Sequence, residues 1–186
     1  MGLKLQYRGK LDQLDRLPAL CDELEDIAAA MGWETDRFDS DYDVPADAQI
    51  VRRADGAHLE GNLGLKGISL SPKRGGDTLW FCFDRAGKLH SLMGMINQIN
   101  GTLKEHATGA VTETQFGGPK LHIWIVSLLR HLKKHYISDL EVKDESGYWD
   151  TGDADELRRR MNRINNPIEQ IARETNTRLR KDSPAE

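Results

Sequence analysis

The fold depends most on the stretch Lys120–Tyr136, whose sequence is KLHIWIVSLLRHLKKHY. Its large apolar residues recur at three- and four-residue steps, which is the spacing of one face of an α-helix. These residues are Leu121, Ile125, Leu128, Leu132 and Tyr136. Gly117, Gly118 and Pro119 precede them, and proline is common in the first turn of a helix. We therefore predict a helix over 120–136 whose leucine-rich side packs against a sheet.

The residues before that helix alternate between strand and helix patterns. Leu3, Leu5 and Tyr7 alternate with polar residues, which predicts a first strand. An apolar face then predicts a helix that ends at Gly32. Its apolar positions are Leu17, Leu20, Leu24, Ile27 and Met31. A second strand is expected over 33–38.

The middle of the chain is interpreted as antiparallel sheet that follows a polar loop. The loop covers 39–57, and a short strand at Gln49–Arg52 is the one regular element expected in it. Residues 79–83 are all apolar, so the side chains that point to either face of this strand are apolar, which indicates a strand buried on both faces. Leu63 and Leu65 fall on one face of an extended chain, whereas Ile68 and Leu70 fall on the other. The change occurs across 64–67, which predicts a β-bulge. Further strands are expected over 111–116 and 140–142, whereas 94–109 fits neither pattern.

The C-terminal part is expected to be helical. Asp153 and Glu156 have the spacing of a capping box. Apolar residues follow at alternating steps of four and three, at Leu157, Met161, Ile164, Ile168 and Ile171. Pro167 predicts a break in this helix. Such a seam packs on the sheet or against a second copy, so a homodimer through the C-terminal helices is one hypothesis.

These patterns predict an α+β fold. We expect an antiparallel twisted sheet with helices packed mainly on one face and a helical C-terminus. The predicted organisation is a core domain over 1–152, C-terminal helices over 153–181 that pack on the core or a partner, and a disordered tail over 182–186.

The composition is that of an ordinary globular domain, with 38% hydrophobic and 30% charged residues among 186. Cys21 and Cys82 are too few for a disulfide framework, so we expect two reduced thiols. The chain start lacks the apolar run of a signal peptide, and no apolar run is long enough to cross a bilayer. These features predict a cytoplasmic protein with no membrane association.

Charge is unevenly distributed along the chain. The net charge is −4, yet the window from Leu157 to Lys181 holds eight Lys/Arg against two Asp/Glu. Cationic side chains attract phosphates, but no helix-turn-helix, zinc-finger or RNA-stacking motif accompanies them. We interpret this segment as a solvated or intramolecular charged face. Binding of nucleic acid is the weaker alternative.

Two groups of residues are candidates for a pocket. His122 lies in the first turn of the predicted helix, shortly after Gln115, and backbone N–H groups at a helix start attract anions. The second group is an acidic and aromatic segment between a strand and a helix, where function often sits. It consists of Asp144, Glu145, Tyr148 and Trp149. Adjacent carboxylates point in different directions on an extended chain, so they need His122 or Arg130 as a partner across a cleft.

Metal and cofactor motifs are weak or absent. His131 and His135 are four residues apart on one helix, so they are weak candidates for a shared metal. The two lysines between them would oppose a cation, and we predict no metal site and no cofactor. Asp39, Asp41 and Asp43 alternate as at the start of a calcium loop, but the glycine and terminal glutamate of that motif are missing.

Two classes of function remain open from these residues. The first is a non-catalytic binding or interaction module that uses the C-terminal helices and the Tyr148–Trp149 segment. The second is a hydrolase-like enzyme in which His122, Asp144 and Glu145 line a cleft. The sequence does not identify a small-molecule ligand for either.

Several stretches together resemble a family of uncharacterised bacterial proteins. They are Leu65-Lys66-Gly67-Ile68, Thr114-Gln115-Phe116-Gly117-Gly118-Pro119 with His122-Ile123, Leu128-Leu129-Arg130, and Tyr148-Trp149-Asp150-Thr151-Gly152. The similarity covers roughly Tyr7 to Ile171. No activity is established for that family. The resemblance implies a bacterial, cytosolic origin and supplies no catalytic residues.

Overall fold

The computed structural model describes residues 3–73, 75–102 and 108–166, and it has the predicted α+β fold. The strands are β1 (Lys4–Arg8), β2 (Glu34–Asp39), β3 (Gln49–Arg53), β4 (Gly56–Glu60), β5 (Lys66–Ser71), β6 (Leu79–Phe83), β7 (Leu89–His90), β8 (Ala110–Glu113) and β9 (Glu141–Asp144). The α-helices are α1 (Leu17–Met31), α2 (Leu92–Ile99), α3 (Gly118–His135) and α4 (Tyr148–Thr151), with short 3-10 helices η1 (Leu14–Arg16) and η3 (Gln115–Gly117). A further helix covers 154–166.

The strands form three antiparallel sheets rather than one. Their orders are β8-β1-β9, β2-β5-β6-β7 and β3-β4. The first two sheets are linked through Tyr7, which is fully buried. The Tyr7 hydroxyl donates to the carbonyl of Trp80 at 3.2 Å and accepts the Trp80 N–H at 2.9 Å. Strand β1 is thereby tied to β6 although the two belong to different sheets.

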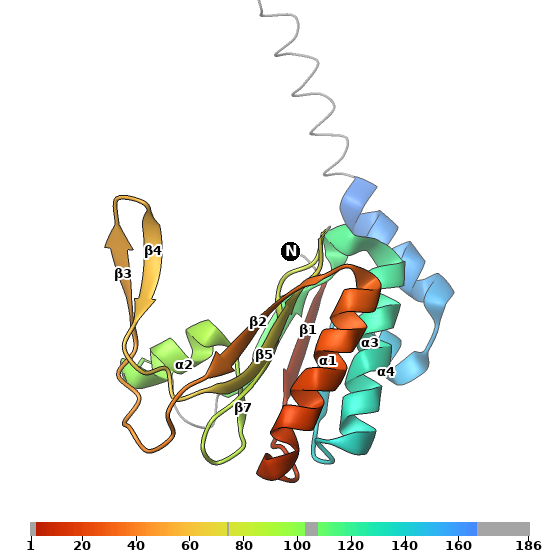
Figure 1. Cartoon of the computed structure of the whole chain (residues 1–186). Coiled ribbons are helices and arrows are strands. Elements are labelled where there is room, and N and C mark those ends of the chain that lie inside the picture. Colours follow the sequence, from red (N-terminus) through yellow and green to blue (C-terminus); the bar gives the residue numbers. More distant parts are fainter. Residues whose placement is uncertain (1–2, 74, 103–107, 167–186) are drawn as a thin grey trace, which may run out of the picture.

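The main core lies between the strands and the pair α1 and α3, which run side by side in Figure 1. The predicted apolar stripe of α3 is confirmed, because Ile125, Leu128 and Leu132 are buried and Tyr136 beyond the helix end is buried too. Helix α2 packs on the opposite side of β6, against Cys82, which alternates with the core residues of that strand. The helices therefore pack mainly on one face, as predicted.

Some local predictions were wrong. The ladder between β2 and β5 runs without interruption from Lys66 to Ser71, so the phase change is not a bulge within this strand. Leu65 instead belongs to the α2 cluster, whereas Ile68 belongs to the main core. The short strand expected at Gln49–Arg52 is present as β3, but the expected loop 39–57 also contains the first residues of β4, which was not predicted. The strand expected over 111–116 ends at Glu113, and η3 follows.

The C-terminal helix was predicted to pack either on the core or on a partner, and residues 154–166 pack on the core. Leu157 and Met161 are buried in a small cluster with Leu3. Asp153 caps the helix, since its Oδ1 accepts the N–H groups of Asp155 and Glu156, both at 2.9 Å. The predicted break at Pro167, the last helix with Ile168 and Ile171, and the tail 182–186 lie outside the described residues. No helix in the described part of the chain is long and apolar enough to cross a membrane.

Replacing Tyr7 with phenylalanine tests the link between the two sheets. We expect the free energy of unfolding to fall by roughly 1–3 kcal/mol, because the N–H and carbonyl of Trp80 lose their shared partner inside the core. Urea unfolding at neutral pH measures the change. Tyr42→Phe is the control, because the Tyr42 hydroxyl donates to the Phe83 carbonyl at 2.8 Å but its side chain is only half-buried, whereas Tyr7 is fully buried. Equal losses in both variants would contradict a special role for Tyr7.

Candidate functional site: a buried histidine–aspartate–serine cluster

The cluster forms where β8 and β9 end at the same edge of the three-stranded sheet. Both strands are antiparallel to β1, so they run parallel to each other. Their last residues, Glu113 and Asp144, lie beside Lys4 and Leu5 of β1. Helix α3 begins just after β8, which brings His122 to this edge. The local order of strand, tight turn and helix therefore places one histidine between two strand ends.

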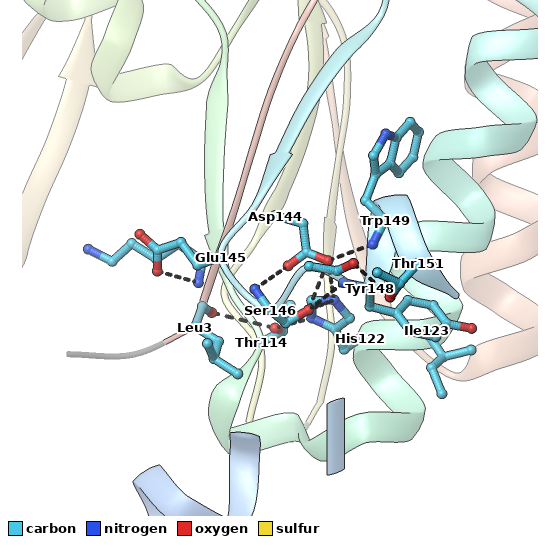
Figure 2. Close-up of polar contacts among 12 residues, drawn as sticks. Leu3, Thr114, His122, Ile123, Asp144, Glu145, Ser146, Tyr148, Trp149 and Thr151 are labelled. Atoms are coloured by element: carbon cyan, nitrogen blue, oxygen red, sulfur yellow. Dashed lines mark hydrogen bonds and ion pairs between the residues drawn. The ribbon is translucent and has the colours of Figure 1, made fainter. Parts of the chain in front are cut away.

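His122 is fully buried, and both ring nitrogens have partners (Figure 2). Its Nδ1 lies 2.7 Å from Thr114 Oγ1. Its Nε2 lies 3.2 Å from Asp144 Oδ2 and 3.1 Å from Ser146 Oγ. The predicted meeting of His122 with Asp144 therefore takes place, but in the interior and not in an open cleft.

Asp144 is the acceptor that organises the cluster, and its side chain has no exposed surface. Oδ1 accepts the N–H of Ser146 at 2.8 Å. Oδ2 accepts the Ser146 hydroxyl at 2.8 Å and the N–H of Trp149 at 2.9 Å. Burial by itself raises the pKa of Asp144, but the hydrogen bond and charge of His122, with the Ser146 and Trp149 donors, outweigh it and lower the pKa to about 2. The side chain of Asp144 is therefore a carboxylate at neutral pH. It accepts hydrogen bonds from four donors: His122 Nε2, the Ser146 N–H, the Ser146 hydroxyl and the Trp149 N–H.

This arrangement differs from a hydrolytic triad in how the serine is held. In such a triad the serine and the carboxylate bind opposite nitrogens of the imidazole. Here Asp144 and Ser146 lie at the same nitrogen, and the Ser146 hydroxyl donates to Asp144 while it accepts the N–H of Tyr148 at 3.2 Å. Ser146 is also 2% exposed, so its oxygen is not presented to a substrate. The geometry is that of a structural hydrogen-bond network.

The other candidate residues lie outside this network or contribute only backbone. Glu145 turns away from Asp144 and accepts the N–H of Lys4 at 3.1 Å, so the two adjacent carboxylates do point apart. Gln115 is buried, and its Oε1 has no hydrogen-bond partner among the described residues. Asn165 Nδ2 reaches the backbone carbonyl of Gln115 at 3.5 Å.

Of the aromatic pair, Tyr148 packs its ring against the cluster, whereas Trp149 reaches it only through its backbone N–H and its ring points away (Figure 2). The Tyr148 ring meets the His122 ring edge-on, with centroids 6.0 Å apart. The Arg130 guanidinium lies 5.5 Å from the centre of the Trp149 ring and donates to the Trp149 carbonyl at 2.6 Å. Arg130 is thus engaged with Trp149 and not with the two acids. Tyr148 and Trp149 lie in α4, where a loop was expected.

The two histidines four residues apart are used in another contact. The His131 and His135 rings lie next to each other, tilted by 38°, with centroids 4.5 Å apart. His131 Nε2 lies 2.6 Å from Glu23 Oε1, and the other carboxylate oxygen accepts the Tyr136 hydroxyl at 2.5 Å. This contact joins α1 to the end of α3. In the residues that the structure describes, no group of three or more His, Cys, Asp or Glu side chains is arranged to hold a metal ion.

Two members of the cluster were not anticipated from the sequence. Ser146 follows Asp144 by two residues, and this spacing is the signature of an aspartate that accepts the N–H two positions on. That signal was available. Thr114 carried no such signal, because its contact with His122 depends on how β8 and α3 are placed. Comparison with protein-family models, curated proteins and solved structures finds no match, so the function must be argued from this geometry.

Proposed function

We propose that this chain is a non-catalytic interaction module that binds another polypeptide through the β3–β4 hairpin. The observation that carries the proposal is that this hairpin is a separate two-stranded sheet with no buried side chain. It projects from the rest of the molecule beyond α2 (Figure 1). A two-stranded hairpin alone in water is marginally stable, so a partner surface would complete it.

The apolar residues of the hairpin support a protein partner. Ile50 and Leu59 face each other across the two strands, and each is 41% exposed. Val51 on the other face is half-buried by its cross-strand neighbour His58. Paired exposed aliphatic residues on a projecting ribbon are typical of a contact surface.

The base of the hairpin is held firmly, so the ribbon is presented in one direction. Asn62 accepts the N–H groups of Asp47 and Ala48 through its carbonyl at 2.9 and 3.0 Å. Its side-chain amide donates to the carbonyls of Asp41 and Val44 at 2.9 and 2.8 Å. Ala48 is fully buried. A fixed base reduces the conformational entropy that binding has to overcome.

The C-terminal helices, the buried histidine cluster and the basic segment receive less support as functional surfaces. Leu157 and Met161 are buried within the chain, so they are not free to form a seam with a partner. The hydrolase alternative would require His122 to reach a substrate, and that ring is fully buried with both nitrogens bonded. Arg158, Arg159 and Arg160 of the C-terminal helix pair with Asp155 or Glu156 of the same helix, which weakens the nucleic-acid alternative.

Photo-cross-linking tests the proposed function. A photo-reactive amino acid in place of Ile50 is expected to capture a polypeptide in cells, whether another protein or another copy of this chain. The same amino acid in place of Met93 is the matched control, because Met93 is 50% exposed but lies on α2 and not on the hairpin. Covalent products of equal amount from both positions, or from neither, would contradict the proposal.

A further inference from the structure

Resting on the proposed function above, we infer that the hairpin binds a second copy of this chain, strand to strand along the free edge of β4. In the two-stranded sheet each strand has one edge that pairs with no other strand among the residues that the structure describes. Unpaired N–H and carbonyl groups along such an edge are a template for another strand. Two copies related by a two-fold axis would form one four-stranded sheet of order β3-β4-β4-β3. Three or more strands with an apolar face are stable where two are not.

Charge selects β4 over β3 as the pairing edge. Strand β3 carries Arg52 and Arg53, so its pairing with a copy of itself would gather four arginines. Strand β4 has one formally charged residue, Glu60 at its end. Like charges opposite one another destabilise a strand pair. The free edge of β4 is therefore the one that tolerates an identical neighbour.

The apolar residues match when the two-fold axis passes through His58, the middle residue of β4. Antiparallel pairing about this point sets Leu59 of one copy opposite Ala57 of the other. Both residues lie on the same face as Ile50, because Ile50 pairs with Leu59 in each hairpin and successive residues alternate between faces. The joined sheet then has two mirrored rows in which Ile50, Leu59 and the other copy's Ala57 lie side by side, and the other copy's Arg52 ends each row.

The same register also matches charges between copies. Glu60 comes opposite Gly56 of the second copy, which has no side chain, and Gly56 pairs in turn with Arg53. Glu60 of each copy therefore lies in one cross-strand row with Arg53 of the other copy. Within its own hairpin, Glu60 already forms an ion pair with Arg53. Each hairpin has two arginines and two acids, Asp55 and Glu60, so the paired ribbons carry no net repulsion despite the net charge of −4 of the chain.

Cysteine cross-linking tests the axis directly. His58→Cys would place two thiols opposite each other, with Cβ atoms roughly 4.5–5.5 Å apart, near disulfide range. We expect this variant to form a covalent dimer under mild oxidation. Val51→Cys is the matched control, because Val51 faces His58 on the same side of the hairpin but lies on β3, away from the axis. The native Cys21 and Cys82 are both buried and should not react.

The mass of the unmodified chain gives a second, independent measurement. Sedimentation of the native protein should show a dimer whose population rises over about a hundredfold range of concentration, by mass action. Leu59→Asp should abolish that dimer and also the His58→Cys cross-link, because it introduces charge into the apolar row. Met93→Asp, a similar change on α2, should leave both unchanged.

The outcomes separate this inference from the proposed function. Cross-linking through Val51→Cys alone, or equally through both cysteine variants, would overturn pairing along β4 about His58. A native chain that stays monomeric and a His58→Cys variant that does not cross-link would overturn the second copy as partner. In that case, capture of a different protein at position 50 would leave the proposed function standing, whereas no capture would refute both.

Discussion

Asp144→Ala is expected to lower the free energy of unfolding by about 3–5 kcal/mol, because it leaves buried donors without their shared acceptor. The donors are the N–H groups of Ser146 and Trp149, the Ser146 hydroxyl and His122 Nε2. Urea unfolding at neutral pH, followed by tryptophan fluorescence, measures the change. The adjacent variant Glu145→Ala is the control and should alter stability by less than about 1 kcal/mol, because Glu145 is exposed and holds one backbone N–H.

The sign of this effect separates a structural cluster from a catalytic one. Residues of active sites are often held in arrangements that reduce stability, so their removal can stabilise a protein. If Asp144→Ala left the stability of the protein unchanged or raised it, the structural interpretation would fail, and a reactive role for His122 and Ser146 would return. A large loss would support a cluster that holds together β8, α3, β9 and α4.

The contribution of Asp144 to the free energy of unfolding should also depend on pH. The pKa of Asp144 is about 2 in the folded chain against 3.8 for an unperturbed aspartate. A depressed pKa in the folded state contributes stability above the unfolded pKa, and that contribution is lost as the pH falls through the folded value. We expect this group to contribute on the order of 2 kcal/mol above about pH 4, declining toward pH 2. In Asp144→Asn the decline over this window should be reduced by that amount, which urea titrations at several pH values would reveal.

Gly67→Ala is the second change with a large expected effect, because Gly67 of β5 pairs with Cys82 of β6 and has no room for a side chain. Its φ of 146° is one that side-chain-bearing residues rarely adopt, and an added Cβ would lie 2.2 Å from the carbonyl oxygen of Phe81. Backbone strain alone is worth about 1–3 kcal/mol. The overlap must be relieved by separating two core strands, so we expect a total loss of roughly 3 kcal/mol or more in the free energy of unfolding.

Gly32→Ala is the control that isolates the backbone contribution. Gly32 follows α1 with a φ of 66°, and an added Cβ would have no atom within 4 Å. This variant should lose only about 1–2 kcal/mol, the penalty for an alanine in the left-handed region. Thermal or urea unfolding of the two variants side by side gives the difference. Similar losses at both positions would show that the close approach of β6 is not limiting.

The sequence predicted most elements whose side chains alternate or recur regularly. The helices 17–31 and 118–135 and the strands β1 and β6 follow from apolar periodicity, and Gly32 ends α1 as expected. Strand β2 was expected after Gly32, but its one apolar residue, Phe38, gives no periodic pattern. In the β3–β4 hairpin the sequence predicts β3 but not β4, because these strands are short and lack a buried face. The pair Asp55-Gly56 between apolar residues was the available signal for it. The helix α2 was missed because eight residues give a weak periodic pattern.

The candidate site shows where sequence reasoning reached its limit. Local spacing predicted that His122 begins a helix and that Asp144 ends a strand, and both positions are correct within a few residues. It could not tell whether these groups face solvent or the interior, because burial is set by what packs over them. Here α4 and the C-terminal helix cover that edge through Tyr148 and Leu157. His122 and Asp144, which the sequence suggested would line a cleft, are therefore part of a buried hydrogen-bond network.

By itself, then, the sequence determined which segments are helical or extended and which face of each is apolar, because those properties depend on neighbours a few residues apart. Only the tertiary structure decided that the strands divide into three sheets, that His122 is enclosed and that β3–β4 is left uncovered. The physical reason is that exposure and pairing depend on contacts between residues distant in the chain, such as Tyr7 with Trp80 and Thr114 with His122. No local pattern of residues encodes such contacts.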